Sequence, residues 1–128
     1  MNKDGSKKMI LLVDDDEIHL EITKNMLEQH YEIITARSGS EALEFFTKAI
    51  FPDLVLLDVL MPEMDGWETY NRIKGIGLLK DIPIIFLTSM EDASAEIHAH
   101  RLGAADYIKK PCDPEDLLKR VARVLSMA

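Results

Sequence analysis

The sequence predicts an α/β protein in which helices cover both faces of a parallel β-sheet. Five short apolar runs alternate with five longer amphipathic stretches along the 128 residues, and this alternation is typical of repeated strand–helix units. The runs are nearly continuous in Ile, Leu and Val, as expected for strands buried on both faces. The length suits one domain, so we expect a single domain over residues 1–128 with its core at about residues 9–125.

The apolar runs define the expected strands. Each run is short and is followed by polar or turn-forming residues, which mark the point where the chain leaves the core. In chain order the expected strands are Met9–Val13, Tyr31–Ala36, Asp53–Leu57, Pro83–Leu87 and Ala105–Lys109.

The first two helices are predicted from helical spacing and a capping motif. A helix over Glu17–Gln29 would bury one side formed by Ile18, Ile22, Met26 and Leu27. Ser38 lies three residues before Glu41, which is the spacing of a capping box and predicts a helix to about Ile50. The expected buried stripe of that helix is Ala42, Phe46, Ala49 and Ile50.

Three further helices follow from loop and capping signals. Met61–Gly66 is expected to be a loop before a helix over Trp67–Lys74, which the glycines at 75 and 77 end. Glu91–Leu102 is a weaker helix whose apolar side is mostly alanine with Ile97 and Leu102, and Gly103 stops it. The last helix begins after the cap Asp113 with Pro114 at its first position, and its expected buried residues are Leu117, Val121, Val124 and Leu125.

Composition excludes several functions. The 15 basic and 23 acidic side chains give a net charge of −8, and such a domain would be repelled by nucleic-acid phosphates. The longest apolar runs are far shorter than the ~20 residues of a membrane span. Residues 1–8 lack the apolar stretch of a signal peptide, and a single cysteine excludes an internal disulfide. We therefore expect a cytoplasmic protein that binds neither nucleic acid nor membrane.

Candidate functional residues follow four of the five strands. Asp14, Asp15 and Asp16 come after the first strand, Asp58 after the third, Thr88 and Ser89 after the fourth, and Lys110 after the fifth. Ligands of open α/β sheets bind beyond the carboxyl ends of the strands, so these groups should converge. The combination of carboxylates, a hydroxyl and an ammonium is chemically complementary.

The carboxylate cluster requires a compensating charge. Two unit charges ~5 Å apart repel by about 3 kcal/mol at an effective dielectric constant near 20, and three such pairs approach ~10 kcal/mol. The cluster must therefore take up protons or bind a cation. Hard oxygen ligands suit Mg²⁺, and a nearby lysine and threonine are typical phosphate ligands. The set indicates a metal-assisted phosphoryl site.

The acceptor at such a site is expected to be a carboxylate. The four histidines (His19, His30, His98 and His100) are expected to lie on the surface, and Cys112 is expected to be a packed apolar thiol. Aspartyl phosphates are known covalent intermediates, so an aspartate remains as the acceptor.

At these residues the chain resembles the receiver domain of two-component response regulators. The resemblance runs from about Met9 to Leu125 and is carried by the segments Ile10–Asp16, Asp53–Gly66, Pro83–Ser89 and Tyr107–Pro111. Any one of these segments alone would be a weak signal, but together they are specific. The resemblance implies a flavodoxin-like (βα)5 fold with strand order 2-1-3-4-5 and a cis Lys110–Pro111 bond.

The resemblance also implies a role for each site residue. Asp58 matches the phosphoacceptor. The implied ligands of Mg²⁺, or alternatively Mn²⁺, are Asp14, Asp15, Asp58 and the backbone carbonyl of Leu60. Lys110 and Thr88 would contact the phosphoryl group, and Tyr107 would turn inward when they do. Leu60 and Met90 occupy the positions that tune hydrolysis, and neither can orient a water molecule through a polar side chain.

The implied mechanism is phosphoryl transfer from a phosphohistidine on a histidine kinase or a histidine phosphotransfer protein to Asp58. The transfer would repack the face formed by helix four, strand five and helix five, where an unidentified downstream protein or output domain would bind. The chain would then be no enzyme in the ordinary sense, because it catalyses only its own phosphorylation and dephosphorylation.

Three alternatives make different predictions. A haloacid-dehalogenase-like phosphatase needs a second aspartate two residues after its nucleophile, where this chain has Leu60. A flavin carrier would need a phosphate-binding loop after strand one, where this chain has three acids, and it would be yellow. An interaction module that works without phosphorylation would not respond to a phosphoryl donor.

Overall fold

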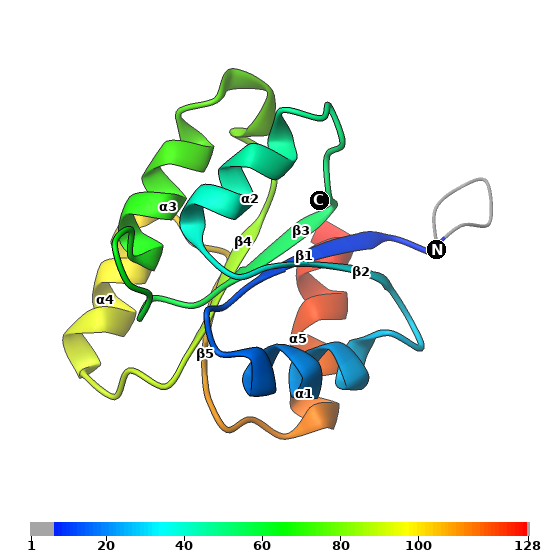
Figure 1. Cartoon of the computed structure of the whole chain (residues 1–128). Coiled ribbons are helices and arrows are strands. Elements are labelled where there is room, and N and C mark those ends of the chain that lie inside the picture. The colour runs from blue at the N-terminus through cyan, green and yellow to red at the C-terminus, as the bar shows by residue number, and fades with distance from the viewer. Residues whose placement is uncertain (1–6, 128) are drawn as a thin grey trace.

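The computed structural model, which describes residues 7–127, contains one parallel five-stranded sheet with the strand order β2-β1-β3-β4-β5 (Figure 1). This confirms the predicted fold class and strand order. The strands are β1 (Met9–Val13), β2 (Glu32–Ala36), β3 (Leu54–Leu57), β4 (Ile84–Thr88) and β5 (Asp106–Lys109). All four neighbouring pairs are parallel, so the carboxyl ends of the strands share one edge.

Helices cover both faces of the sheet (Figure 1). One face carries α1 (Glu17–Leu27) and α5 (Pro114–Met127), and the other carries α2 (Gly39–Phe46), α3 (Gly66–Lys74) and α4 (Ala93–Leu102). A short 3₁₀ helix, η1 (Gly77–Leu79), follows α3. Within residues 7–127, no helix has the length and apolarity needed to span a membrane.

The core consists of two layers separated by the sheet. Leu11 and Val13 of β1 pack toward α2, α3 and α4, whereas Ile10 and Leu12 pack toward α1 and α5. In β3 all four residues are buried. The absence of a polar face in these strands explains their continuous apolar sequence.

The predicted buried side of α1 is partly wrong. Leu27 is buried and Met26 is half-buried against the core, but Ile18 and Ile22 are 70% and 49% exposed, and Leu20 and Thr23 are buried in their place. Asp16 caps the helix by accepting hydrogen bonds from the backbone N–H groups of Ile18 and His19. The side that packs on the sheet carries Leu20, Thr23 and Leu27, and the spacing of the isoleucines did not predict it.

Two other helices also differ from prediction. Helix α2 ends at Phe46, and Ala49 adopts a left-handed backbone with φ 58°, so Ala49 and Ile50 are exposed. In α4, Ile97 is 53% exposed, and the small side chains of Ala95 and Ala99 make the buried contact. Gly103 ends α4 with φ 96°, as predicted.

The start of α3 is packed against the chain that leaves β3. Asp65 caps the helix through the backbone N–H of Glu68, and the N–H of Gly66 donates to the Val59 carbonyl at 2.9 Å. A Cβ atom at residue 66 would lie 2.2 Å from the Asp58 carbonyl oxygen and 2.6 Å from the Val59 Cα. Only glycine permits this close approach, which holds the segment containing Asp58 in place.

We predict that Gly66→Ala destabilises the fold by about 2–3 kcal/mol, because both clashing atoms belong to the backbone and cannot rotate away. Urea unfolding measures the change. Gly77→Ala is the matched control: a Cβ there meets no atom within 4 Å, so its stability should change by less than about 1 kcal/mol. Equal stabilities of the two variants would contradict the packing argument.

Candidate functional site

The acids that follow β1 divide into two roles. Asp14 and Asp15 join a carboxylate cluster, whereas Asp16 serves as the N-cap of α1. The backbone N–H of Asp14 donates to the Ala36 carbonyl at 3.1 Å, and this bond extends the β1–β2 pairing by one residue. Asp14 Oδ1 accepts a hydrogen bond from the Asp16 N–H at 2.9 Å. Asp14 is therefore held at the sheet edge by backbone contacts.

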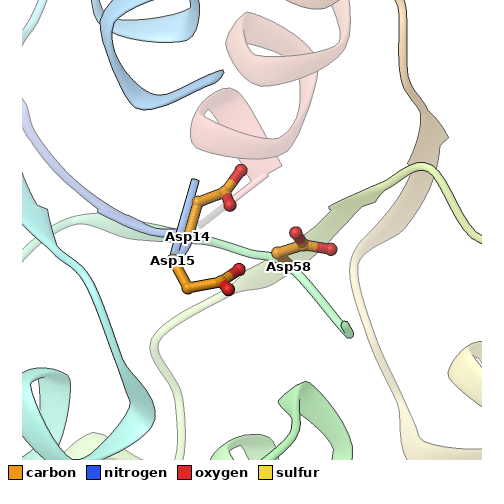
Figure 2. A group of neighbouring side chains, drawn as sticks. All are labelled: Asp14, Asp15 and Asp58. Carbon is orange, nitrogen blue, oxygen red and sulfur yellow. The ribbon is translucent and has the colours of Figure 1, made fainter. Parts of the chain in front are cut away.

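Asp58 lies beside these acids at the end of β3. Its N–H donates to the Val13 carbonyl at 2.9 Å, and its Oδ1 accepts from the Leu60 N–H at 3.3 Å. Figure 2 shows Asp14 and Asp15, which follow β1, next to Asp58. One carboxylate oxygen from each of the three residues lies within 4.8 Å of the others. Asp14 and Asp58 are buried, and Asp15 is half-buried.

Lys110 brings a positive charge to the cluster. It follows β5, where its N–H donates to the Thr88 carbonyl at 2.9 Å, and the predicted cis bond to Pro111 is confirmed. The Lys110 Nζ lies 2.6 Å from Asp14 Oδ2 and 3.4 Å from Asp58 Oδ2. All three side chains are nearly buried, so these contacts are weakly screened by water.

Thr88 and Tyr107 connect the cluster to α4. Thr88 is fully buried, and its hydroxyl accepts a hydrogen bond from the Met90 N–H at 3.2 Å. The Tyr107 hydroxyl donates to the Met90 carbonyl at 3.1 Å. The Tyr107 ring is buried in this structure, and its movement on phosphorylation stays a prediction.

Leu60 and Met90 lie on the open side of the site. They line a groove with Val59, Met61, Pro62, Asp65 and Trp67. Leu60 is half exposed, and among the described residues lining this groove Asp65 has the only ionisable side chain. That side chain caps α3 through the Glu68 N–H. The predicted role of Leu60 and Met90 in hydrolysis therefore remains a prediction.

The electrostatics of the site favour an added cation. Burial raises the pKa of Asp58, and the Asp14 charge raises it further, while the Thr88 hydrogen bond and Lys110 lower it. When all groups are ionised, three carboxylates face one ammonium, which leaves two negative charges uncompensated. Carboxylate oxygens at this spacing suit a hard divalent ion such as Mg²⁺.

His19 is the residue that sequence analysis missed. We expected all four histidines on the surface, but the His19 Nδ1 lies 3.3 Å from the Lys110 Nζ and 3.4 Å from Asp16 Oδ2. The available signal was position: His19 is three residues after the helix cap Asp16 and so faces back toward the strand ends. The apolar pattern of α1 alone did not predict that the His19 side chain faces the site.

Buried acids and one lysine lie beyond the carboxyl ends of the parallel strands. This arrangement is typical of α/β domains that bind a metal ion and a phosphoryl group in an acidic pocket. Residues 10–122 match the family model of the response regulator receiver domain, and the chain belongs to this family. It is therefore a receiver domain of two-component response regulators. Such domains are regulatory phosphoacceptors that bind Mg²⁺ at an acidic pocket.

Similar proteins carry different names. The chain is 42% identical over 120 residues to the "Probable cyclic di-GMP phosphodiesterase" of Vibrio cholerae, covering 93% of this chain and 27% of that protein. It is 41% identical over 118 residues to the transcriptional regulatory protein CrdR of Helicobacter pylori, covering 91% and 54%. Among solved structures, the Vibrio cholerae chemotaxis protein CheY4 has a TM-score of 0.85 at 33% identity, covering 93% of this chain and 99% of that one. The chain spans about a quarter to a half of the length of these two curated relatives.

We predict that Asp58→Asn stabilises the metal-free protein at pH 7 by on the order of 1 kcal/mol. Because burial raises the pKa of Asp58 above its usual 3.8, the folded protein binds this proton more tightly than the unfolded chain does. The stability that this proton provides is lost as pH rises from about 3.8 through the folded pKa. The gain from Asp58→Asn should therefore grow with pH over this window.

Urea unfolding between pH 3 and pH 7 in the presence of a chelator measures this difference. The exposed Asp81, changed to Asn, is the control, and its difference from wild type should vary less with pH than that of Asp58→Asn. A gain for Asp58→Asn that is the same at both ends of the range would contradict the assigned burial effect.

Proposed function

We propose that Asp58 is the phosphoacceptor of this receiver domain and that a histidine kinase or histidine phosphotransfer protein supplies the phosphoryl group. The observation that carries the proposal is the convergence of Asp58 with Asp14, Asp15 and Lys110. Of the expected phosphate ligands, the Lys110 Nζ lies 3.4 Å from Asp58 Oδ2, and the Thr88 hydroxyl lowers the pKa of Asp58.

In the proposed reaction, a carboxylate oxygen of Asp58 attacks the phosphorus of a phosphohistidine. The new P–O bond forms as the P–N bond breaks, and its electron pair returns to the imidazole of the donor. Asp58 must be ionised to attack. The Lys110 and Thr88 contacts, which lower the pKa of Asp58, oppose the effect of burial and favour the ionised form.

The proposed metal ligands are the side chains of Asp14, Asp15 and Asp58 with the backbone carbonyl of Leu60. Mg²⁺, or alternatively Mn²⁺, would neutralise the oxygens of the transferred group when bound. Lys110 would then exchange a carboxylate partner for a phosphoryl oxygen. This exchange needs only a small movement, because its Nζ already lies between Asp14 and Asp58 at 2.6 Å and 3.4 Å.

The proposed signal passes through Thr88 to α4. A phosphoryl oxygen that accepts the Thr88 hydroxyl would change the contact with the Met90 N–H, and the Met90 carbonyl holds Tyr107. Helix α4 can respond because only Ala95 and Ala99 are fully buried in it, and a thin contact of this kind gives low local stability.

The output surface is proposed to be the face formed by α4, β5 and α5, with a protein or an output domain as its partner. The net charge of −8 disfavours direct nucleic-acid binding by this domain. We propose that it acts on no separate substrate. Since its proposed donors are phosphorylated from ATP, we also propose a cytoplasmic location.

We predict that acetyl phosphate with Mg²⁺ adds one phosphoryl group to the wild-type protein and none to Asp58→Asn. Asparagine has no ionised oxygen with which to attack phosphorus, and a chelator should prevent the wild-type reaction because the acids are then left without a cation. Intact mass measures the addition. Asp81→Asn, which changes an exposed acid elsewhere, should react like wild type. Addition of a phosphoryl group to Asp58→Asn would show that another residue is the acceptor.

We predict that the phosphorylated protein survives for minutes or longer in Mg²⁺, because the side chains of Leu60 and Met90 cannot orient an attacking water molecule. Replacement of Met90 by Gln should shorten the lifetime several-fold by supplying a polar group at that position. Decay of the phosphorylated mass with time measures both values. A wild-type half-life of seconds would contradict the prediction.

A further inference from the structure

The His19 imidazole lies where it can control the orientation of Lys110. It projects from the first turn of α1 into a groove formed with Ile22, Thr23, Met26, Ser89 and the segment 110–112. Its side chain is 42% exposed, so protons from solvent reach it. Its Nδ1 atom is 3.3 Å from the Lys110 Nζ and 3.4 Å from Asp16 Oδ2.

These two neighbours make opposite demands on a single nitrogen atom. The Lys110 ammonium is only a donor, so Nδ1 can bond to it only as an unprotonated acceptor. The Asp16 carboxylate is only an acceptor, so Nδ1 can bond to it only when it carries a proton. The protonation state of the imidazole therefore selects between Lys110 and Asp16.

The neutral imidazole completes the surroundings of Lys110. An ammonium has three N–H donors, and the described residues offer three acceptors within 3.4 Å: Asp14 Oδ2, Asp58 Oδ2 and His19 Nδ1. A protonated imidazole removes the third acceptor and places a second positive charge next to the first. The ammonium then loses its fixed orientation toward Asp58.

The other charged and titratable groups near His19 are few. Asp16 lies at the start of its own helix, and the Asp16 pKa is lowered first by the His19 backbone N–H and also by the His19 and Lys110 charges. Across the groove stand Lys110 and the Cys112 thiol, whose pKa is raised by burial, so that thiol stays neutral. Asp14 and Asp58 both contact Lys110, which is the neighbour that His19 shares with them.

We propose that His19 is a positioning residue for Lys110, which it holds toward Asp58 when neutral and releases when protonated. Phosphorylation of this receiver domain then slows when the imidazole is protonated. The proposal rests on the proposed function, because Lys110 matters to the reaction only if Asp58 is the acceptor.

The test compares the initial rate of phosphorylation by acetyl phosphate and Mg²⁺ between pH 5.5 and 8.5, measured by intact mass. In this donor reaction the Asp58 oxygen bonds to phosphorus as acetate leaves. The wild-type rate should fall about tenfold on acidification, which is the usual effect of losing one hydrogen bond to a charged group. His100→Asn, which removes an exposed histidine on α4, should keep this pH dependence.

Two substitutions of His19 separate positioning from structure. His19→Asn places a non-titrating amide oxygen at the position of Nδ1, so it should keep the alkaline wild-type rate at every pH. His19→Leu offers no acceptor, so its rate should be about tenfold lower at alkaline pH and should not fall further on acidification. The donor, the metal and Asp58 are the same in all variants, so a difference between the pH profiles of two variants comes from residue 19.

The proposal is overturned if His19→Asn keeps the wild-type pH dependence, if the wild-type rate does not fall on acidification, or if His19→Leu reacts as fast as wild type at alkaline pH. Thermal melting identifies any variant that fails to fold, and His19→Asn alone still tests the pH dependence. Failure of the proposed function looks different. In that case the wild-type protein gains no phosphoryl group at any pH, or Asp58→Asn still gains one.

Discussion

The repulsion among three carboxylates at one edge of the sheet is the constraint on which the site depends. Asp14 and Asp58 are buried and lie with Asp15 inside 4.8 Å, where water screens their charges poorly. Lys110 offsets part of this repulsion through both buried acids. The remaining negative charge makes the site receptive to a divalent cation.

The fold holds these charges together by means of its backbone. Parallel pairing places the ends of β1 and β3 side by side, and the bond from the Asp58 N–H to the Val13 carbonyl continues that pairing to Asp58. Gly66 lets α3 approach the carbonyl of Asp58. The unfavourable electrostatic free energy of the clustered carboxylates is therefore offset by the hydrophobic core, in which apolar strands are buried on both faces.

Contacts around Met90 link the site to the surface. Its N–H donates to the Thr88 hydroxyl and its carbonyl accepts from the Tyr107 hydroxyl, so this one residue joins the end of β4 to β5 just before α4. On the opposite side of the site, His19 joins Lys110 to the cap of α1. The two relatives with different names share this segment with the chain, which fits a common input module.

The strands and the acids that converge with Lys110 could be predicted from the residues alone, because continuous apolar runs and the residues that end them are local features. The strand order was implied by the resemblance to receiver domains. The buried side of α1, the end of α2 and the burial of the Tyr107 ring were not predicted. Those features depend on the packing of Leu20, Thr23 and Leu27, the left-handed Ala49 and the Met90 carbonyl. The place of His19 beside Lys110 was likewise decided by tertiary structure, since the two residues are 91 positions apart and only the packing of α1 against the end of β5 brings them together.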